Sequence, residues 1–308
     1  MRVCVDIGGT KVAVSLSPAN GSPLVGRRTE PTAKTGTNDA VAQQILRMVD
    51  EACAEQGVDP KSVDCAGVAT AGPFELHDGM VELASPNICG GIAGPARGLP
   101  NDWRTALLEA PLKKRFARVR VENDGVAALE AERRWGALQG LDHCAYVTWS
   151  TGVGVGLCVD GRILRGKNGN AGHAGHSFVV DDASGALCGC GNVGDVEALV
   201  AGNSMARRFG QSPQDLFAAA ASGEAQAREI TDALCRVMGR MLFNLIATLD
   251  LQRISLGGSV FWHNRDFLLP RLQAQVDGHL PPLTRGVLLV AAGLGDRVGD
   301  YAALALLD

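Results

Sequence analysis

The hydrophobic pattern opens with two short apolar stretches separated by a polar glycine turn. Residues 2–17, RVCVDIGGTKVAVSLS, predict a strand, a turn and a second strand, followed by a turn at Asn20-Gly21. A dinucleotide-binding Rossmann unit needs a helix directly after its first strand. The pattern therefore argues against a Rossmann start.

Further along the chain, the spacing of apolar residues predicts both helices and strands. Helices are expected at 39–57, 126–138, 197–209, 224–250 and 298–307. Strands are expected at 65–74, at 118–123 running into a turn at 124–125, at 146–157, at 158–164 with an Asp160-Gly161 turn, and from 253 into a glycine turn. Residues 88–102 are rich in glycine and proline, and we expect a long loop of a length that is uncommon unless functional.

The strand-turn-strand plan occurs twice, once with DIGGTK (6–11) and once with STGVGVG (150–156), and helices follow each copy. Two halves of similar plan predict a duplicated α/β domain with a cleft between the copies.

Composition narrows the class of protein. A chain of 308 residues suits two domains. Its net charge of −4 offers no basic face for nucleic acid, and its longest apolar runs, 287–292 and 301–307, are far shorter than the roughly 18 residues of a membrane span. No secretory signal follows Arg2. The nine cysteines are read as reduced thiols, which predicts a cytoplasmic protein.

The glycine-rich turns are candidate phosphate sites, because backbone N–H groups in such turns can hold an anion. The alternative for each turn is an ordinary hairpin in which glycine supplies a positive φ. A helix does not follow STGVGVG, so this turn again disfavours a nicotinamide site, and LGGS (256–259) could form a wall for a nucleotide base. The candidate nucleotide-binding residues are Asp6, Gly8, Gly9, Thr10, Lys11, Ser150, Thr151, Gly152, Gly154, Gly257 and Gly258.

A second group of chemically active residues lies in GHAGH (172–176) and CGCGNVGDVE (188–197). Two histidines lie within four residues of each other beside glycines, and Cys188 and Cys190 are followed by Asp195 where a metal site would want a third thiolate. Carboxylate oxygen is an acceptable zinc donor, although sulfur and nitrogen dominate structural zinc sites. The residues alone leave open a zinc site, a relic of one, or a loop shaped by hydrogen bonds.

Together these motifs resemble the ROK family of sugar kinases, which belongs to the actin-like, ribonuclease-H-like ATPase fold. The likeness runs through DIGGTK (6–11), GVATAGPF and DGMVELASPN (67–87), ENDG (122–125), STGVGVG (150–156), GKNGNAGHAGH (166–176), CGCGNVGDVE (188–197) and SLGGSV (255–260). It implies two α/β domains around a central cleft: a small N-terminal domain of residues 1–118 plus 295–308, and a large C-terminal domain of residues 119–294.

The resemblance also implies a reaction: transfer of the γ-phosphoryl group of ATP, held with Mg²⁺, to the 6-hydroxyl of a hexose. Asp124 is the candidate general base, and Asp6 would organise the magnesium ion. The implied sugar-binding residues are Gly72, Asn87, Asn123, Asp124, His173, His176 and Glu197. The implied zinc ligands are His176, Cys188, Cys190 and Asp195, the last in place of the usual cysteine.

The identity of the sugar stays open. Glucose or mannose is the default of the family, whereas His173, where a glutamate is usual, favours N-acetylmannosamine. The 88–102 loop and the altered metal site also allow an amino sugar such as kanosamine. A sugar-sensing regulator without catalysis is the alternative of another class, disfavoured because the phosphate motif begins at residue 6 and leaves no room for a DNA-binding module. The resemblance suggests a homodimer or tetramer.

Overall fold

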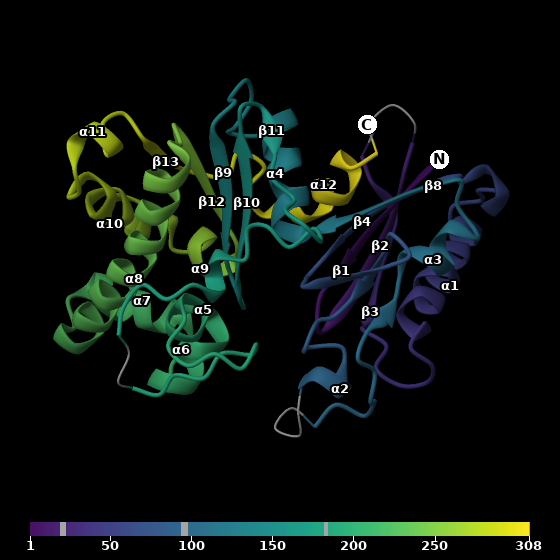
Figure 1. The fold of residues 1–308 in the computed structure, drawn as a ribbon, viewed down its shortest axis with the longest axis horizontal. Helices are drawn as coiled ribbons and strands as arrows, with labels where there is room; N and C mark the ends of the chain where they lie inside the picture. Colours follow the sequence, from purple (N-terminus) through teal and green to yellow (C-terminus); the bar gives the residue numbers. More distant parts are fainter. Residues whose placement is uncertain (19–22, 94–97, 182–183, 308) are drawn as a thin grey trace. The chain divides into compact units, whose positions relative to one another are not determined.

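The computed structural model describes residues 1–18, 23–93, 98–181 and 184–307, and these form two compact α/β units (Figure 1). Unit 1 comprises Met1–Ala131, Arg165–Ala171 and Gly299–Asp308. Unit 2 comprises Glu132–Leu164 and Gly172–Val298. The predicted turn at Asn20-Gly21 lies outside the described residues.

Unit 1 is built on a five-stranded sheet with the order β3-β2-β1-β4-β8. The first three strands are antiparallel, and β4 and β8 continue parallel to β1. Its main strands and helices are β1 (Arg2–Ile7), β2 (Lys11–Ser17), β3 (Val25–Pro31), α1 (Ala40–Glu55), β4 (Cys65–Thr70), α3 (Glu109–Lys113), β8 (Arg118–Asn123) and α12 (Val298–Ala305).

Helix α1 packs its buried residues, Val41, Ile45 and Met48 among them, on the sheet of unit 1. Helix α12 lies so close to β4 that a Cβ on Gly67 would be 2.1 Å from the carbonyl oxygen of Ala303. A small second sheet, β5-β6-β7, completes the unit. Its elements and neighbours are η1 (Pro60–Ser62), β5 (Phe74–His77), β6 (Met80–Leu83), α2 (Gly90–Ala93) and β7 (Ala106–Leu107).

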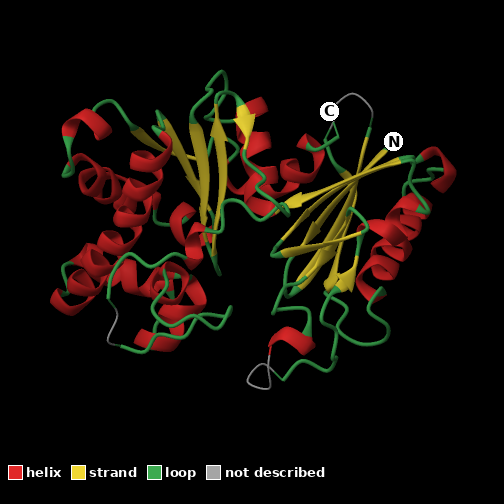
Figure 2. Cartoon of the chain, in the orientation of Figure 1, coloured by secondary structure: helices red, strands yellow, loops and turns green. Residues whose placement is uncertain are grey.

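Unit 2 repeats the plan of unit 1, a sheet with helices beside it (Figure 2), and its strand order is β11-β10-β9-β12-β13. Its first three strands are again antiparallel, and β12 and β13 continue parallel to β9. The two-copy plan predicted from the sequence is therefore confirmed. The strands are β9 (Cys144–Trp149), β10 (Val153–Val159), β11 (Arg162–Ile163), β12 (Arg253–Gly257) and β13 (Leu288–Ala291).

The helices of unit 2 are dominated by α8, a 25-residue helix that packs against α7 and α10 (Figure 1). Helix α4 (Asp124–Trp135) runs from unit 1 into unit 2. No helix among the described residues has the length and apolar character needed to span a membrane. The helices of unit 2 are η3 (Ala174–His176), α5 (Val196–Val200), α6 (Gly202–Phe209), α7 (Pro213–Ser222), α8 (Ala225–Leu249), α9 (Ser259–Trp262), α10 (Arg265–Asp277), α11 (Pro281–Thr284) and η4 (Gly295–Arg297).

The predicted turn at 124–125 and the helix bounds 126–138 were wrong. Helix α4 begins directly at Asp124, because the Asn123 side chain accepts a hydrogen bond from the Gly125 N–H at 2.9 Å and satisfies a donor of the first turn. It ends early because the Glu132 carboxylate accepts a hydrogen bond from the Ala137 N–H at 2.9 Å and folds over Gly136, where a Cβ would be 2.5 Å from the carboxylate.

The single helix predicted at 197–209 is also wrong, since it divides into α5 and α6. Ala201 is extended, and the Gly202 N–H donates instead to the carbonyl of Ser150 at 2.8 Å. That hydrogen bond holds the backbone against the turn between β9 and β10, so the series of helical hydrogen bonds is interrupted between α5 and α6.

Several other predicted boundaries shift. The strand predicted at 65–74 ends at Thr70, and the one predicted at 146–157 is divided by the turn at 150–152. The 88–102 loop contains the short helix α2, and residues 94–97 lie outside the described residues. The Asp160-Gly161 turn is confirmed, with φ of 51° and 71° as a type I′ hairpin turn requires. Helices α7 and α10 were not predicted.

Candidate active site

The candidate catalytic residues of unit 1 gather at one edge of its sheet. Strands β1, β4 and β8 are parallel neighbours, and their last residues, Ile7, Thr70 and Asn123, are register partners. The segments that follow these residues carry Gly8, Gly72 and Asp124. Ligands of open α/β sheets bind beyond the carboxyl ends of the strands, so this edge is the expected location of a site.

Asp6 and Asp124 interact electrostatically at this edge. Burial, and to a lesser extent the negative charge of Asp124, raise the pKa of the Asp6 carboxyl from 3.8 to about 6, although Lys11 and Arg27 act in the opposite direction. A partly buried carboxylate beside a second carboxylate is a favourable place for a divalent cation, and oxygen is the donor that Mg²⁺ prefers. These residues therefore fit a magnesium ion.

Asp124 is the first residue of α4 and follows β8 without a turn. The partial positive charge of a helix N-terminus stabilises a carboxylate at this position. Asn123 is buried, and its side-chain oxygen is engaged by the Gly125 N–H. A side-chain amide also carries two N–H donors, which suit a sugar hydroxyl.

The glycine turn after β1 lies against another predicted sugar-binding residue. A Cβ on Gly9 would be 2.6 Å from the Cβ of Asn87, so only glycine allows this approach. The Gly8 N–H donates to the Lys11 carbonyl at 2.8 Å and closes the turn. Thr10 and Lys11 are exposed beside it. The structure thus brings the predicted phosphate turn and Asn87 together.

In unit 2 the turn between β9 and β10 is tied to Glu197. The Val153 N–H donates to the Glu197 carboxylate at 2.9 Å, and a Cβ on Gly152 would be 2.6 Å from the same carboxylate oxygen. The Ser150 hydroxyl lies 3.0 Å from that of Ser259, at the start of α9. A predicted sugar-binding carboxylate and a predicted nucleotide turn therefore share one corner of unit 2, with Thr151 exposed on the turn.

The glycines that end β12 are required by close packing. A Cβ on Gly257 would be 2.3 Å from the Tyr146 hydroxyl, and Gly258, with φ of 86°, would place a Cβ 2.5 Å from the Trp149 carbonyl. Gly154 lies inside β10, opposite Thr148, and is a strand residue. The structure therefore places it outside the turn that Ser150 begins.

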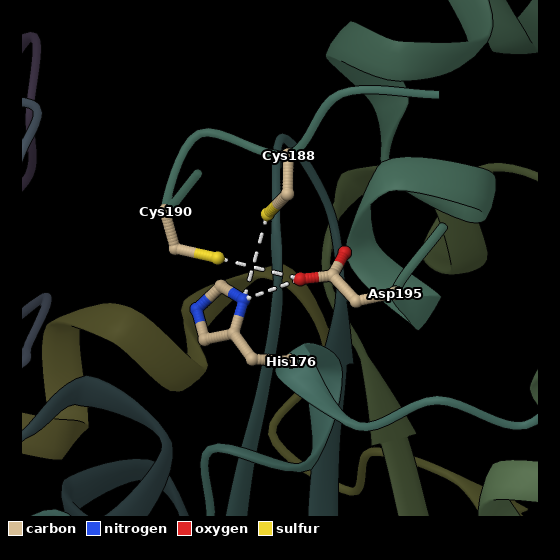
Figure 3. Close-up of side chains that lie close together, drawn as sticks. All are labelled: His176, Cys188, Cys190 and Asp195. Atoms are coloured by element: carbon tan, nitrogen blue, oxygen red, sulfur yellow. Dashed lines mark hydrogen bonds and ion pairs between the residues drawn. The ribbon is translucent and has the colours of Figure 1, made fainter. Parts of the chain in front are cut away.

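The four predicted metal ligands converge in unit 2 (Figure 3). One ligand atom from each of His176, Cys188, Cys190 and Asp195 lies within 4.8 Å of the other three. The His176 Nδ1 is 3.2 Å from Asp195 Oδ2 and 3.5 Å from Cys188 Sγ, and Cys190 Sγ is 3.4 Å from Asp195 Oδ2. Donors arranged tetrahedrally around zinc are about 3.3–3.8 Å apart, given its bond lengths.

Asp195 has two tasks in this cluster. Its Oδ1 accepts a hydrogen bond from the Ala198 N–H at 2.7 Å and caps α5, while its Oδ2 faces the other three side chains. The side chain is fully buried. Burial alone would raise its pKa, but the hydrogen bonds from His176, the Ala198 N–H and the two cysteines outweigh it, so the pKa is lowered.

The other groups of the cluster respond to the same environment. The hydrogen bond to Asp195 raises the pKa of His176, against the effect of burial. Burial raises the pKa of the Cys188 and Cys190 thiols. One nitrogen, two sulfurs and one carboxylate oxygen are a donor set that zinc accepts, and a bound cation would displace the thiol protons. The residues therefore fit zinc.

Two neighbouring residues were not predicted from the sequence. The Asn192 side chain donates to Asp195 Oδ2 at 3.2 Å, and Ser259 lies against Ser150. Asn192 lies between the metal-binding residues in CGCGNVGDVE, and Ser259 ends LGGS, so their position inside a motif was the available signal. His173 stacks on His176, with ring centroids 6.0 Å apart.

Similarity to known proteins identifies the family of the chain. Residues 2–308 match the sequence model of the ROK family. A glucokinase of Aeropyrum pernix is 30% identical over 328 residues, covering 99% of this chain and 95% of that protein. An N-acetylmannosamine kinase of Salmonella typhimurium is 33% identical over 269 residues, covering 84% and 82%.

The crystal structure of a ROK family glucokinase from Streptomyces griseus, in complex with glucose and AMPPNP, superposes with a TM-score of 0.71 at 26% identity. The match covers 98% of this chain and 97% of that one. The predicted actin-like α/β fold is thereby confirmed. The chain belongs to the ROK family.

Proposed function

We propose that this protein is an ATP-dependent sugar kinase that transfers the γ-phosphoryl group of ATP to the 6-hydroxyl of a hexose. The observation that carries the proposal is the placement of Asp6 and Asp124 at the carboxyl ends of the parallel strands of unit 1, where burial and then the charge of Asp124 raise the pKa of Asp6. Such a pair supplies both a position for a cation and a base. The kinase names of the relatives and the AMPPNP complex support the same assignment.

In this proposal Asp124 is the general base. Its carboxylate accepts the proton of the 6-hydroxyl as the oxygen attacks the γ-phosphorus, and the bond from that phosphorus to the β-γ bridging oxygen breaks to leave ADP. The N-terminus of α4 presents its partial positive charge to this carboxylate. Magnesium, when bound, neutralises the developing charge on the phosphates.

The nucleotide contacts are assigned to the glycine turns of both units. Gly8, Gly9, Thr10 and Lys11 would face the phosphates, with Asp6 holding magnesium through water. In unit 2 the turn that Ser150 begins, and the Gly257-Gly258 turn, would contact the nucleotide. Backbone N–H groups and hydroxyls of this kind are suited to phosphate oxygens.

The sugar contacts are assigned to Gly72, Asn87, Asn123 and Asp124 of unit 1 and to His173, His176 and Glu197 of unit 2. Because Nδ1 of His176 faces Asp195 and Cys188, Nε2 is the nitrogen that would reach a sugar hydroxyl. Zinc, when bound, would fix the loop that carries His176 and leads to Glu197. A structural role of this kind acts on binding without a zinc-dependent chemical step.

His173 favours an N-acetylated hexose, N-acetylmannosamine first, over glucose. An imidazole in place of a carboxylate removes a charged acceptor and adds bulk, and a relative named N-acetylmannosamine kinase is 33% identical. Glucose, and an amino sugar such as kanosamine, are the competing substrates. The proposal also includes a homodimer or tetramer. It places the protein in the cytoplasm, with which the nine free cysteines are consistent.

The test is ADP release by purified protein with ATP and Mg²⁺ and a panel of glucose, mannose, N-acetylglucosamine, N-acetylmannosamine, glucosamine and kanosamine. We expect one sugar to exceed the others by orders of magnitude. Measurable sugar binding without ADP release for any sugar would instead favour the sensing function.

A further inference from the structure

Residues 165–171, here called the strap, leave unit 2 after Leu164 and return to it at Gly172, immediately before His173. The strap itself belongs to unit 1. A connection between β11 and η3 could have stayed within unit 2, so the contacts that hold these seven residues against unit 1 require an explanation.

One end of the strap is held by charge. Arg165 pairs with Glu130 at 2.9 Å and also with Glu122, and both glutamates are buried. Arg120 contacts the same two carboxylates. Glu122 directly precedes Asn123 and Asp124, so this end of the strap is fixed to the segment that carries the proposed base.

The other end is held by the Asn170 side chain. Its Oδ1 accepts a hydrogen bond from the Phe74 N–H at 2.8 Å, and its Nδ2 donates to the Phe74 carbonyl at 2.8 Å. Exchanging both backbone hydrogen bonds with one residue is what a paired strand residue does, so this amide acts as a strand neighbour for the first residue of β5. A Cβ on Gly169 would be 3.3 Å from the Phe74 ring, which leaves little room for any other residue there.

Phe74 cannot follow the strap freely, because it is anchored in unit 1. Its ring is buried in the core, and its register partner across β5 and β6 is Leu83. The Asn170 clamp therefore fastens the strap to a rigid part of the unit. Gly72 lies two residues before the clamped Phe74, and His173 lies three residues after Asn170.

We propose that Asn170 is a positioning residue for the sugar: it joins the backbone that follows Gly72 to the segment that leads into His173, so that both are ordered together. This inference rests on the proposed kinase function. It adds a residue that touches neither the sugar nor ATP in the assignment above and that acts through Phe74 and the strap. Loss of the clamp should weaken sugar binding and leave the nucleotide turns unaffected.

The test compares Asn170→Ala with Lys167→Ala, a matched variant at an exposed position of the same strap. Because two hydrogen bonds are lost at roughly 0.5–1.5 kcal/mol each, we expect Asn170→Ala to raise the sugar KM by about tenfold. The KM for ATP should stay within about twofold, and Lys167→Ala should match the wild type, since exposed substitutions rarely matter.

Hydrogen exchange supplies a readout that does not depend on catalysis. The Phe74 amide should exchange faster in Asn170→Ala than in the wild type, because Asn170 is its acceptor. If the wild type phosphorylates no sugar, the proposed function fails, yet faster exchange together with weaker sugar binding by calorimetry would still support the clamp.

The positioning role is overturned if the Phe74 amide exchanges faster while the sugar KM is unchanged, or if the KM values for sugar and ATP rise equally. Should the alanine variant not fold, Asn170→Asp keeps the acceptor for the Phe74 N–H and removes the donor to the Phe74 carbonyl. We then expect a sugar-specific rise in KM, because a carboxylate oxygen would face the Phe74 carbonyl, and an unchanged sugar KM would reject the proposal.

Discussion

The two units share one sheet plan, but each places a carboxylate in a different environment. In unit 1, Asp6 is the second-last residue of β1. Burial and the charge of Asp124 raise its pKa to about 6. In unit 2, Glu132 is fully buried, and it accepts hydrogen bonds at 2.9–3.0 Å from the Ser255 hydroxyl and the N–H groups of Ala137, Gly293 and Leu294.

The difference separates function from structure. Glu132 has its acceptors satisfied, so it joins the end of α4 to β12 and to the segment after β13, which is a structural task. Asp6 is held in an electrostatically unfavourable position that a cation would relieve. Proteins retain such unfavourable groups where function requires them.

The largest expected effect is that of Asp124→Asn. The amide cannot accept the proton of the sugar hydroxyl, so turnover should fall roughly 10²–10⁴-fold. The melting temperature should change little, because Asn is tolerated at a helix N-terminus. ADP release with the preferred sugar measures the effect, and wild-type turnover in this variant would refute the assignment of the base.

Asp6→Asn should have opposite effects on stability and activity. The folded-state pKa of about 6 exceeds the ordinary 3.8, so as pH rises from about 4 to 6 the unfolded chain ionises first and the folded state loses stability. Asparagine removes this penalty, raising the free energy of unfolding above pH 6 by at most about 3 kcal/mol. The gain should vanish below about pH 4.

Urea titrations at pH 7.5 and pH 4, without magnesium, measure this difference. Activity of the same variant should fall at saturating sugar and be partly recovered by raised magnesium, since the variant lacks the carboxylate that organises the ion. Equal stability of variant and wild type at pH 7.5 would contradict the unfavourable position of Asp6.

Glu132→Gln should lower the free energy of unfolding by about 1–3 kcal/mol, because the amide replaces an acceptor with a donor that faces an N–H group. Glu229→Gln, at an exposed position of α8, is the control and should stay within about 0.5 kcal/mol of the wild type. Urea denaturation distinguishes the two. If the Glu132→Gln variant had the same free energy of unfolding as the wild type, the hydrogen bonds of Glu132 would not stabilise unit 2.

The smallest effect separates the two tasks of Asp195. Both Asp195→Asn and Asp195→Ala should lower the zinc content measured by mass spectrometry, since each removes the carboxylate ligand. Asparagine still caps a helix, so it should be more stable than alanine by about 1 kcal/mol. Equal stability of the two variants would argue against the capping of α5 by Asp195. Full zinc content in either variant would argue against Asp195 as a metal ligand.

Local sequence determined the repeated strand-turn-strand plan, the helices α1 and α8, and the Asp160-Gly161 turn. These depend on apolar spacing and on residues that tolerate positive φ, and both are visible within a short window. The four candidate metal ligands were implied by the family resemblance of two neighbouring motifs, and they lie within 20 residues of sequence.

Tertiary contacts decided the rest. The break between α5 and α6 depends on the Ser150 carbonyl, and the end of α4 depends on a carboxylate that also binds β12 and the segment after β13. The approach of Gly9 to Asn87, the charge of Asp124 acting on Asp6, and the attachment of the strap to unit 1 join residues that are far apart in the chain. The sequence alone determined which residues are available for chemistry, but only folding sets the distances between them, and hydrogen bonds and electrostatic shifts depend on those distances.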